Sequence, residues 1–349
     1  MSALVYSAPP DAVSAGLKAP FPYFGGKSRV AAAVWQRFGD PANYVEPFFG
    51  SGAVLLSRPH APRIETVNDA DAFLCNVWRA MQADPEAVAR WADWPVNEVD
   101  LRARHLWLVT EGAAHVERLK TDPDYYDVKI AGWWLWGICQ WIGNGWCRTL
   151  HRQIPHLEDA GMGVHRKMPH LGDAGKGVHR NLSQQMPNTF LGGVHSVTRP
   201  LDEWFVRLSE RLRRVRVCCG DWTRVTGESV TIKHGLTAVF LDPPYSHSER
   251  ESKLYSVETD CAVQAREWAV ANGDNPLLRL AICGYDTEHE EFIPPNWERL
   301  RWKAKGGYGS QGEGRGRENA GRECIWFTPH CLKVRRNQML LWSEEEVGP

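Results

Sequence analysis

The tetrapeptide Asp242-Pro243-Pro244-Tyr245 follows the apolar run 238–241 and joins a carboxylate, two rigid residues and an aromatic ring. The apolar run favours a buried strand, and the two prolines prevent that strand from continuing. One interpretation is a turn that only ends the strand. The other is a site that needs these groups fixed at the strand's tip.

The chemistry of this tetrapeptide suits an exocyclic amino group. The carboxylate of Asp242 and the carbonyl of Pro243 are acceptors without a donor, and an amine offers two hydrogens to them. Two fixed acceptors favour a pyramidal nitrogen with an exposed lone pair, and they stabilise the positive charge that grows as this nitrogen attacks. Tyr245 can stack on the ring of a base that has left its helix.

A second candidate is the segment 45–52, which reads as the end of a strand and a glycine-rich turn before a helix. Gly50 and Gly52 allow close backbone approach at a helix start, a place suited to a polar ligand group. Glu46 attracts a cation rather than a phosphate, so a ligand with an ammonium group fits better than a dinucleotide. A structural turn without a ligand is the alternative.

Asp69 and Lys27 are further candidates. An acid at the end of the second strand of such a sheet commonly binds the two hydroxyls of a ribose. The alternative is a helix N-cap, which Asn68, Asp69 or Asp71 could each supply. Lys27 follows a glycine pair in 21–29, where its charge can meet a carboxylate or lie in a plain surface turn.

Strand, turn and helix patterns position these residues. They predict a helix and two strand–turn–helix units at 29–38, 43–57 and 63–81, then strands within 215–222, 237–245 and 277–285. Repeated units of this kind indicate an α/β fold with a parallel sheet, which binds ligands beyond the carboxyl ends of its strands.

The middle of the chain has a different character. Residues 84–147 look helical and tryptophan-rich, and we expect most tryptophans of 132–141 to lie in the core. A 14-residue repeat then covers 154–167 and 168–181, with a composition that suits loops or turns. The glycine-rich, basic stretch 305–322 also predicts a loop.

Composition sets further limits. The 349 residues carry a net charge of −1, which argues against a protein that binds polyanions over its whole surface. Residues 148–216 nevertheless hold 12 Lys and Arg against 6 Asp and Glu, the footprint expected for phosphate contact. For the segment 207–216 a solvated helix face is an equally good interpretation.

The nine cysteines form no C-x-x-C pair, and without a signal peptide they indicate reduced intracellular thiols rather than disulfides. We predict no metal site, because Cys324, His330 and Cys331 do not have a recognised ligand spacing. The longest apolar stretch, around 132–143, is too short to span a bilayer. These features predict a cytoplasmic protein with no membrane partner.

Taken together and in order, the segments 22–27, 45–52, 68–71, 220–222 and 242–245 resemble the Dam-type DNA adenine-N6 methyltransferases of the α group. The resemblance covers most of the chain. It implies a Rossmann-like methyltransferase sheet, S-adenosyl-L-methionine as cofactor and double-stranded DNA as substrate. C5 methylation of cytosine commonly uses the thiolate of a Pro-Cys pair, and no such pair occurs here.

The family also implies roles for individual residues. The catalytic residues would be Asp242, Pro243, Pro244 and Tyr245. Those facing the cofactor would be Tyr23, Lys27, Glu46, Pro47, Phe48, Gly50, Gly52, Asp69, Asp221 and Trp222. The segment 143–148 resembles a DNA-contacting segment of the family, which makes Asn144 and Arg148 candidate base readers, with ordinary loop packing as the alternative. The 14-residue repeats have no counterpart in the simplest family members, so no target sequence follows.

The expected organisation is a methyltransferase domain of residues 1–75 and 200–349 with a target-recognition insertion at 76–199. The expected activity is transfer of a methyl group to adenine N6 in duplex DNA by base flipping. The alternatives are an N4-cytosine methyltransferase and a catalytically inactive DNA-binding descendant. We expect a monomer without an obligate protein partner, and a prophage or restriction–modification setting would suit it.

Overall fold

The computed structural model describes residues 17–23, 26–95, 97–122, 124–141, 146–147, 201–244, 256–302 and 322–334, and the observations below concern this part of the chain. Its strands are β1 (Asn43–Glu46), β2 (Ile64–Asp69), β3 (Val215–Cys219), β4 (Thr237–Leu241), β5 (Leu278–Tyr285), β6 (Glu298–Arg301) and β7 (Glu323–Phe327). They form one sheet in the order β3-β2-β1-β4-β5-β7-β6. Strands β1 to β5 pair in parallel, and β7 runs antiparallel to both β5 and β6.

This sheet confirms the predicted α/β class, and all five parallel strands fall within the predicted segments. Strands β6 and β7 were not predicted. β6 has only four residues, of which three are charged, and β7 follows directly on the glycine-rich stretch 305–322. Their short patterns carry little of the alternation by which strands are recognised in a sequence.

The central strands are buried on both faces, as the run 238–241 suggests. Along β4, Ala238 and Phe240 belong to one apolar cluster, whereas Val239 and Leu241 belong to the other. Successive side chains of a strand point to opposite faces, so each cluster covers one side of the sheet. We call the first side the α2 face, because α2 (Ala31–Phe38) packs in that cluster, and the second the α11 face, because α11 (Ser256–Asn272) contributes to the other.

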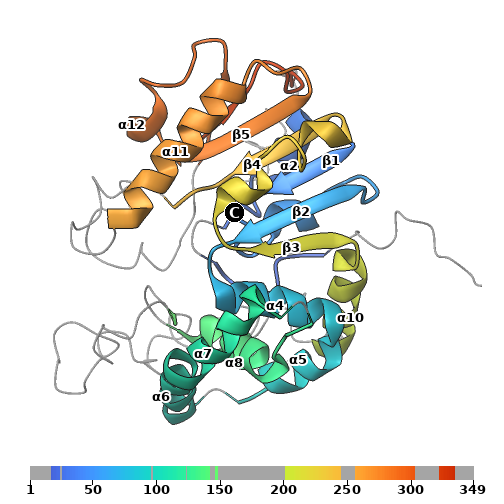
Figure 1. The fold of residues 1–349 in the computed structure, drawn as a ribbon, viewed down its shortest axis with the longest axis vertical. Helices are drawn as coiled ribbons and strands as arrows, with labels where there is room; N and C mark the ends of the chain where they lie inside the picture. The colour runs from blue at the N-terminus through green and yellow to red at the C-terminus, as the bar shows by residue number, and fades with distance from the viewer. Residues whose placement is uncertain are drawn as a thin grey trace, which may run out of the picture.

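The remaining helices of the described residues gather mostly beyond β3, at the end of the molecule opposite β5 and α11 (Figure 1). This group comprises α4 (Ala72–Ala83), α5 (Pro85–Ala92), α6 (Glu98–Trp107), the π-helical turn η1 (Leu108–Gly112), α7 (Ala113–Val116), the 3-10 turn η2 (Glu117–Lys120), α8 (Val128–Gln140) and α10 (Leu201–Leu212). Short elements elsewhere are α3 (Ala53–Leu56), α12 (Asp286–His289), and the 3-10 turns η4 (Trp222–Val225) and η5 (Ile232–His234). No helix in the described ranges is long and apolar enough to span a membrane.

The tryptophans of α8 confirm the core interpretation of 132–141. Trp134 is 1% exposed, and Trp136 is fully buried and donates from Nε1 to the carbonyl of Trp94 at 2.9 Å. Gly132 lets α8 approach α5 closely, since a Cβ there would lie 2.3 Å from the Cβ of Trp91. Trp134 belongs to the same apolar cluster as the α2 face, so the helical group and the sheet share one core.

The predicted boundary between sheet domain and insertion stays a prediction. Helix α4 continues through residue 76 and contacts β3 on one side and α8 on the other. The 14-residue repeats, half of the insertion's basic residues and most of 305–322 lie outside the described residues.

A buried ion-pair network joins the sheet to the helical group. Glu65 on β2 is 1% exposed and binds Arg211 of α10 through two hydrogen bonds, at 2.7 and 2.9 Å. Its Oε1 also accepts a hydrogen bond from Arg58 at 3.1 Å. Both expectations for the segment 207–216, phosphate contact and a solvated face, are therefore wrong for Arg211, because its guanidinium is used inside the protein.

We expect Glu65→Ala to lower the free energy of unfolding by about 3–5 kcal/mol, because it leaves two buried guanidinium groups without their shared anion. Urea denaturation followed by circular dichroism measures this change. The matched control is Glu117→Ala, which removes an exposed pair with Lys120 and should cost less than about 1 kcal/mol. Equal effects for the two variants would contradict the proposed importance of the network.

Candidate active site

Four neighbouring strands bring most of the candidate residues to one edge of the sheet. Strands β3, β2, β1 and β4 lie side by side and run in parallel, so their carboxyl ends share that edge. The segments after β3, β1 and β4 begin with Gly220, Pro47 and Asp242, and Asp69 is the last residue of β2. This is the edge at which open α/β sheets bind ligands.

Asp69 holds the glycine turn rather than capping a helix. Its Oδ2 accepts a hydrogen bond from the backbone N–H of Gly50 at 3.0 Å, and its Oδ1 accepts one from Asp71 at 3.0 Å. The N-cap of α4 is Asp71, which accepts from Phe73 and Leu74. Asp69 is half-buried at this edge, and a carboxylate oxygen can accept more than one hydrogen bond.

Asn68 ties together two other segments at this edge. Its side-chain amide donates to the carbonyl of Pro47 at 3.1 Å and to the carbonyl of Gly220 at 3.0 Å. The segments after β1, β2 and β3 are thus fixed to one another through β2. Neighbouring sequence motifs alone did not reveal this role of Asn68.

The glycine turn requires glycine at residue 50. Gly50 has a φ of +51°, and a Cβ there would lie 2.9 Å from Cδ1 of Tyr23. Tyr23 therefore packs directly on the turn, which brings together two of the predicted cofactor segments. Gly52 closes the turn with a hydrogen bond from its N–H to the carbonyl of Phe49 at 2.9 Å.

Asp242 forms an ion pair with Lys27. Oδ2 of Asp242 lies 2.8 Å from Nζ of Lys27, and the two side chains are 19% and 4% exposed. Burial raises the pKa of Asp242, and the Lys27 ammonium limits that rise. Burial disfavours the charged form of Lys27, but the carboxylate of Asp242 outweighs it, so the pKa of Lys27 lies above its ordinary value.

Glu46 lies close to this pair on β1. It is 3% exposed, and its Oε2 accepts a hydrogen bond from the hydroxyl of Tyr44 at 2.8 Å. Burial raises the pKa of Glu46 well above its ordinary value, and the negative charge of Asp242 adds to this effect. A cation placed beside Glu46 would favour its ionised form.

Aromatic rings flank the end of β3. The ring centroids of Phe48 and Trp222 lie 5.8 Å apart with planes at 33°, and Trp268 of α11 meets Trp222 edge to face at 6.3 Å. Asp221 is exposed and begins η4, where its Oδ1 accepts a hydrogen bond from the N–H of Thr223 at 2.9 Å. The predicted pair Asp221 and Trp222 thus adjoins Phe48.

Three predicted site residues, Tyr245, Asn144 and Arg148, lie outside the described residues. Trp146, between the last two, is 3% exposed and donates from Nε1 to the carbonyl of Trp134 at 3.1 Å. At Trp146, the packing alternative for the segment 143–148 is therefore confirmed.

Cys283 and Trp302 also face the Lys27–Asp242 pair and were missed in the sequence. Trp302 places its ring 5.7 Å from Nζ of Lys27. Cys283 on β5 interacts electrostatically with Asp242. The sequence signal that could have identified Cys283 is its place near the end of the predicted strand 277–285.

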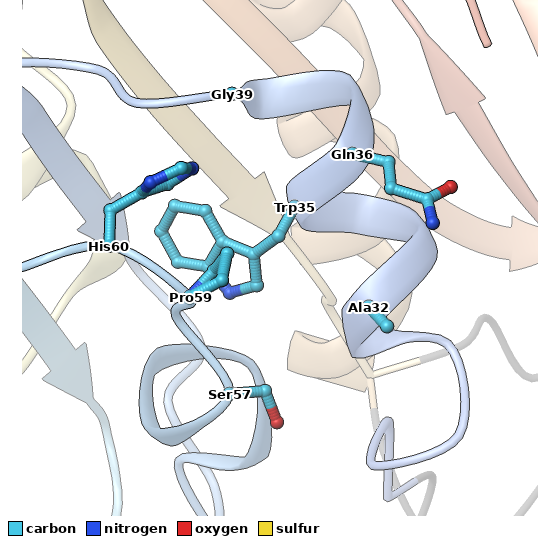
Figure 2. A pocket seen from close by; sticks show the side chains of 7 residues that line it. All are labelled: Ala32, Trp35, Gln36, Gly39, Ser57, Pro59 and His60. Atoms are coloured by element: carbon cyan, nitrogen blue, oxygen red, sulfur yellow. The ribbon is translucent and has the colours of Figure 1, made fainter. Parts of the chain in front are cut away.

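A cavity of about 360 Å³ lies elsewhere, between α2 and the segment 57–60. Figure 2 shows its lining residues, with His60 and Pro59 beside the ring of Trp35. Gly39, which also lines it, precedes β1, and the segment 57–60 precedes β2. The cavity therefore adjoins the amino ends of the strands, away from the edge that carries Asp242.

The sheet order, the antiparallel β7 between β5 and β6, and helices on both faces define a Rossmann-like methyltransferase fold. Residues 23–123 match the family model of the D12 class N6 adenine-specific DNA methyltransferases. The matched segment contains Tyr23, Lys27, the glycine turn and Asp69, and it ends before Asp242. The match confirms the resemblance and supports an adenine methyltransferase. A search of curated proteins gave no match.

We expect Gly50→Ala to lower the free energy of unfolding by at least about 1–2 kcal/mol, because alanine is strained at a positive φ and its methyl group would press on Tyr23. Thermal and urea denaturation measure the loss. Gly227→Ala is the control, since a Cβ there would meet nothing within 4 Å. If Gly50→Ala lowered the free energy of unfolding no more than this control does, the close packing of Tyr23 on the turn would be contradicted.

Proposed function

We propose that this chain transfers a methyl group from S-adenosyl-L-methionine to N6 of adenine in duplex DNA. The observation that carries the proposal is the place of Asp242: it is ion-paired and only partly exposed, and it begins the Asp-Pro-Pro-Tyr segment at the ligand-binding edge of the sheet. The family match over residues 23–123 supports the same reaction.

The donor and acceptor set of this edge fits S-adenosyl-L-methionine. Glu46 would face the ammonium group of its methionine part, beside the turn that contains Gly50 and Gly52. Asp69 would accept the ribose hydroxyls with its carboxylate. The rings of Phe48 and Trp222, with Asp221 beside them, would hold the adenine, and Tyr23 would close over the methionine side. When bound, this cofactor supplies a methyl group on a positively charged sulfur.

Asp242 and the carbonyl of Pro243 would accept the two hydrogens of the target amine. Lys27 keeps the carboxylate ionised and fixes one of its oxygens, so the acceptor does not reorganise during the reaction. The amine nitrogen gains a methyl group and a positive charge, then releases one hydrogen as a proton to Asp242 or to water. The prolines keep the backbone rigid at this point.

An adenine inside a duplex cannot reach these acceptors, so the target base must leave its stack. Tyr245 would stack on the flipped base. Asn144 and Arg148 would contact the DNA beside it, and the basic stretch 148–216, without Arg211, would contact phosphates. A buried carboxylate with no base to bind has no evident purpose in a DNA-binding descendant without activity.

We expect Asp242→Ala to lower the rate of methyl transfer by about 100- to 1,000-fold, because a fixed acceptor for growing positive charge is lost. Transfer of labelled methyl to duplex DNA measures the rate. Calorimetric titration with S-adenosyl-L-methionine should still show binding and so report that the variant is folded. Retained turnover would contradict the proposed role of Asp242, and wild-type protein that binds no cofactor would contradict the function itself.

We also expect cofactor affinity to rise with pH until Glu46 is ionised in the free protein. The pKa of Glu46 is raised by burial, so below that pKa the cofactor's ammonium must displace a proton when it binds. Glu46→Gln should bind more weakly and lose this dependence. Calorimetry at several pH values tests it, and an unchanged pH slope in Glu46→Gln would contradict the placement of the ammonium.

A further inference from the structure

Cys283 occupies a defined position beside Asp242. In the ladder between β4 and β5, Leu241 pairs with Ile282, so the next residues along the two strands are Asp242 and Cys283. Cys283 is fully buried and belongs to the apolar cluster of the α2 face, like Phe240 two residues before Asp242. The two side chains therefore share one face of the sheet as neighbours on adjacent strands, and the two groups interact electrostatically.

The groups around Asp242 come from several elements. Lys27 precedes α2 and contributes its ammonium, and Glu46 on β1 contributes a buried carboxyl group. Glu323 on β7 is 8% exposed and interacts electrostatically with both Lys27 and Cys283. Lys27, Glu46 and Cys283 thus interact with the carboxylate itself, and Glu323 interacts with two of these neighbours.

Cys283 is a donor in this setting rather than a nucleophile. Burial and the charge of Asp242 raise the pKa of its thiol well above the ordinary value, although Lys27 opposes this effect. A neutral thiol carries a hydrogen that it can donate, and the carboxylate of Asp242 is acceptor-only when ionised. A hydrogen bond between the two groups would therefore run from the thiol to the carboxylate.

We propose that Cys283 is a positioning residue for methyl transfer, which holds the carboxylate of Asp242 from the β5 side while Lys27 holds it from the α2 side. The inference rests on the proposed function and adds a residue to it. An ionised carboxylate has about four lone-pair positions. With two of them occupied by Lys27 and Cys283, the others remain for the amine of the base.

The two contacts do different work. Lys27 supplies charge and holds one carboxylate oxygen, Oδ2, whereas a second contact is needed to fix the rotation of the carboxylate about its bond to Cβ. The thiol of Cys283 comes from a buried strand and fixes that rotation. Both contacts favour the ionised form of Asp242, so loss of the thiol should raise the pKa of Asp242.

The test compares Cys283→Ala with Cys283→Ser and with Cys324→Ala. Cys324 is equally buried but lies on β7 in the apolar cluster of the α11 face, so its replacement reports the cost of losing a buried thiol alone. The measurements are kcat and KM for duplex DNA across pH, cofactor affinity by calorimetry and the unfolding transition of each variant.

We expect Cys283→Ala to lower kcat about tenfold, the scale of a hydrogen bond to a charged group, with cofactor affinity within about twofold of wild type. The acid limb of its kcat–pH profile, where activity falls as Asp242 takes up a proton, should move to higher pH, because Asp242 must be ionised to accept the amine hydrogens. Cys283→Ser keeps a donor and should restore both kcat and the acid limb. Cys324→Ala should keep the wild-type pH profile.

If wild type transfers methyl groups and Cys283→Ala has the same kcat and pH profile as Cys324→Ala, the inference is wrong. If wild type transfers none, the proposed function fails instead. Should Cys283→Ala not fold, Cys283→Val fills the space without a donor. A wild-type acid limb in that variant overturns the inference, and an acid limb at higher pH supports it.

Discussion

The ion pair between Lys27 and Asp242 is the interaction on which the candidate active site depends. Alternation along the strands places Glu46, Asp242 and Glu323 on the α2 face near the same edge, and burial raises the pKa of Glu46 and of Asp242. Without a cation there, buried carboxylates would take up protons and lose their value as acceptors. Lys27, held where α2 begins, supplies that charge at 2.8 Å from Asp242.

The rest of the fold keeps this edge rigid. The carbonyl of Lys27 accepts hydrogen bonds from the N–H groups of Val30 and Ala31 at the start of α2, which fixes the lysine's backbone. Asp69 and Asn68 fasten the segments after β1 and β3 to β2. The buried pair of Glu65 and Arg211 joins the opposite part of β2 to α10, so the helical group is attached to the sheet by charge as well as by apolar packing.

Much of this arrangement follows from the sequence, because strand alternation and motif order are local signals. The parallel strands, the glycine turn and the edge that carries Asp242 were predicted correctly.

The partner of Lys27 was not predicted, since a lysine beside a glycine pair fits many carboxylates and only the fold selects one. Arg211 was misread for the same reason: a basic helical segment looks solvent-facing until its partner Glu65 is known. Cys283 was missed, because a cysteine in an apolar strand resembles ordinary core, and only its place near the end of that strand sets it apart. The roles of Tyr245, Asn144 and Arg148 stay predictions.

The measurement that bears most directly on this account is an analysis of the nucleosides in duplex DNA treated with the purified chain and S-adenosyl-L-methionine. Liquid chromatography and mass spectrometry separate N6-methyladenine from N4-methylcytosine, which present the same amine donors to Asp242. The account predicts N6-methyladenine as the product. Methylation of cytosine instead, or no modified base from a protein that binds the cofactor, would contradict it.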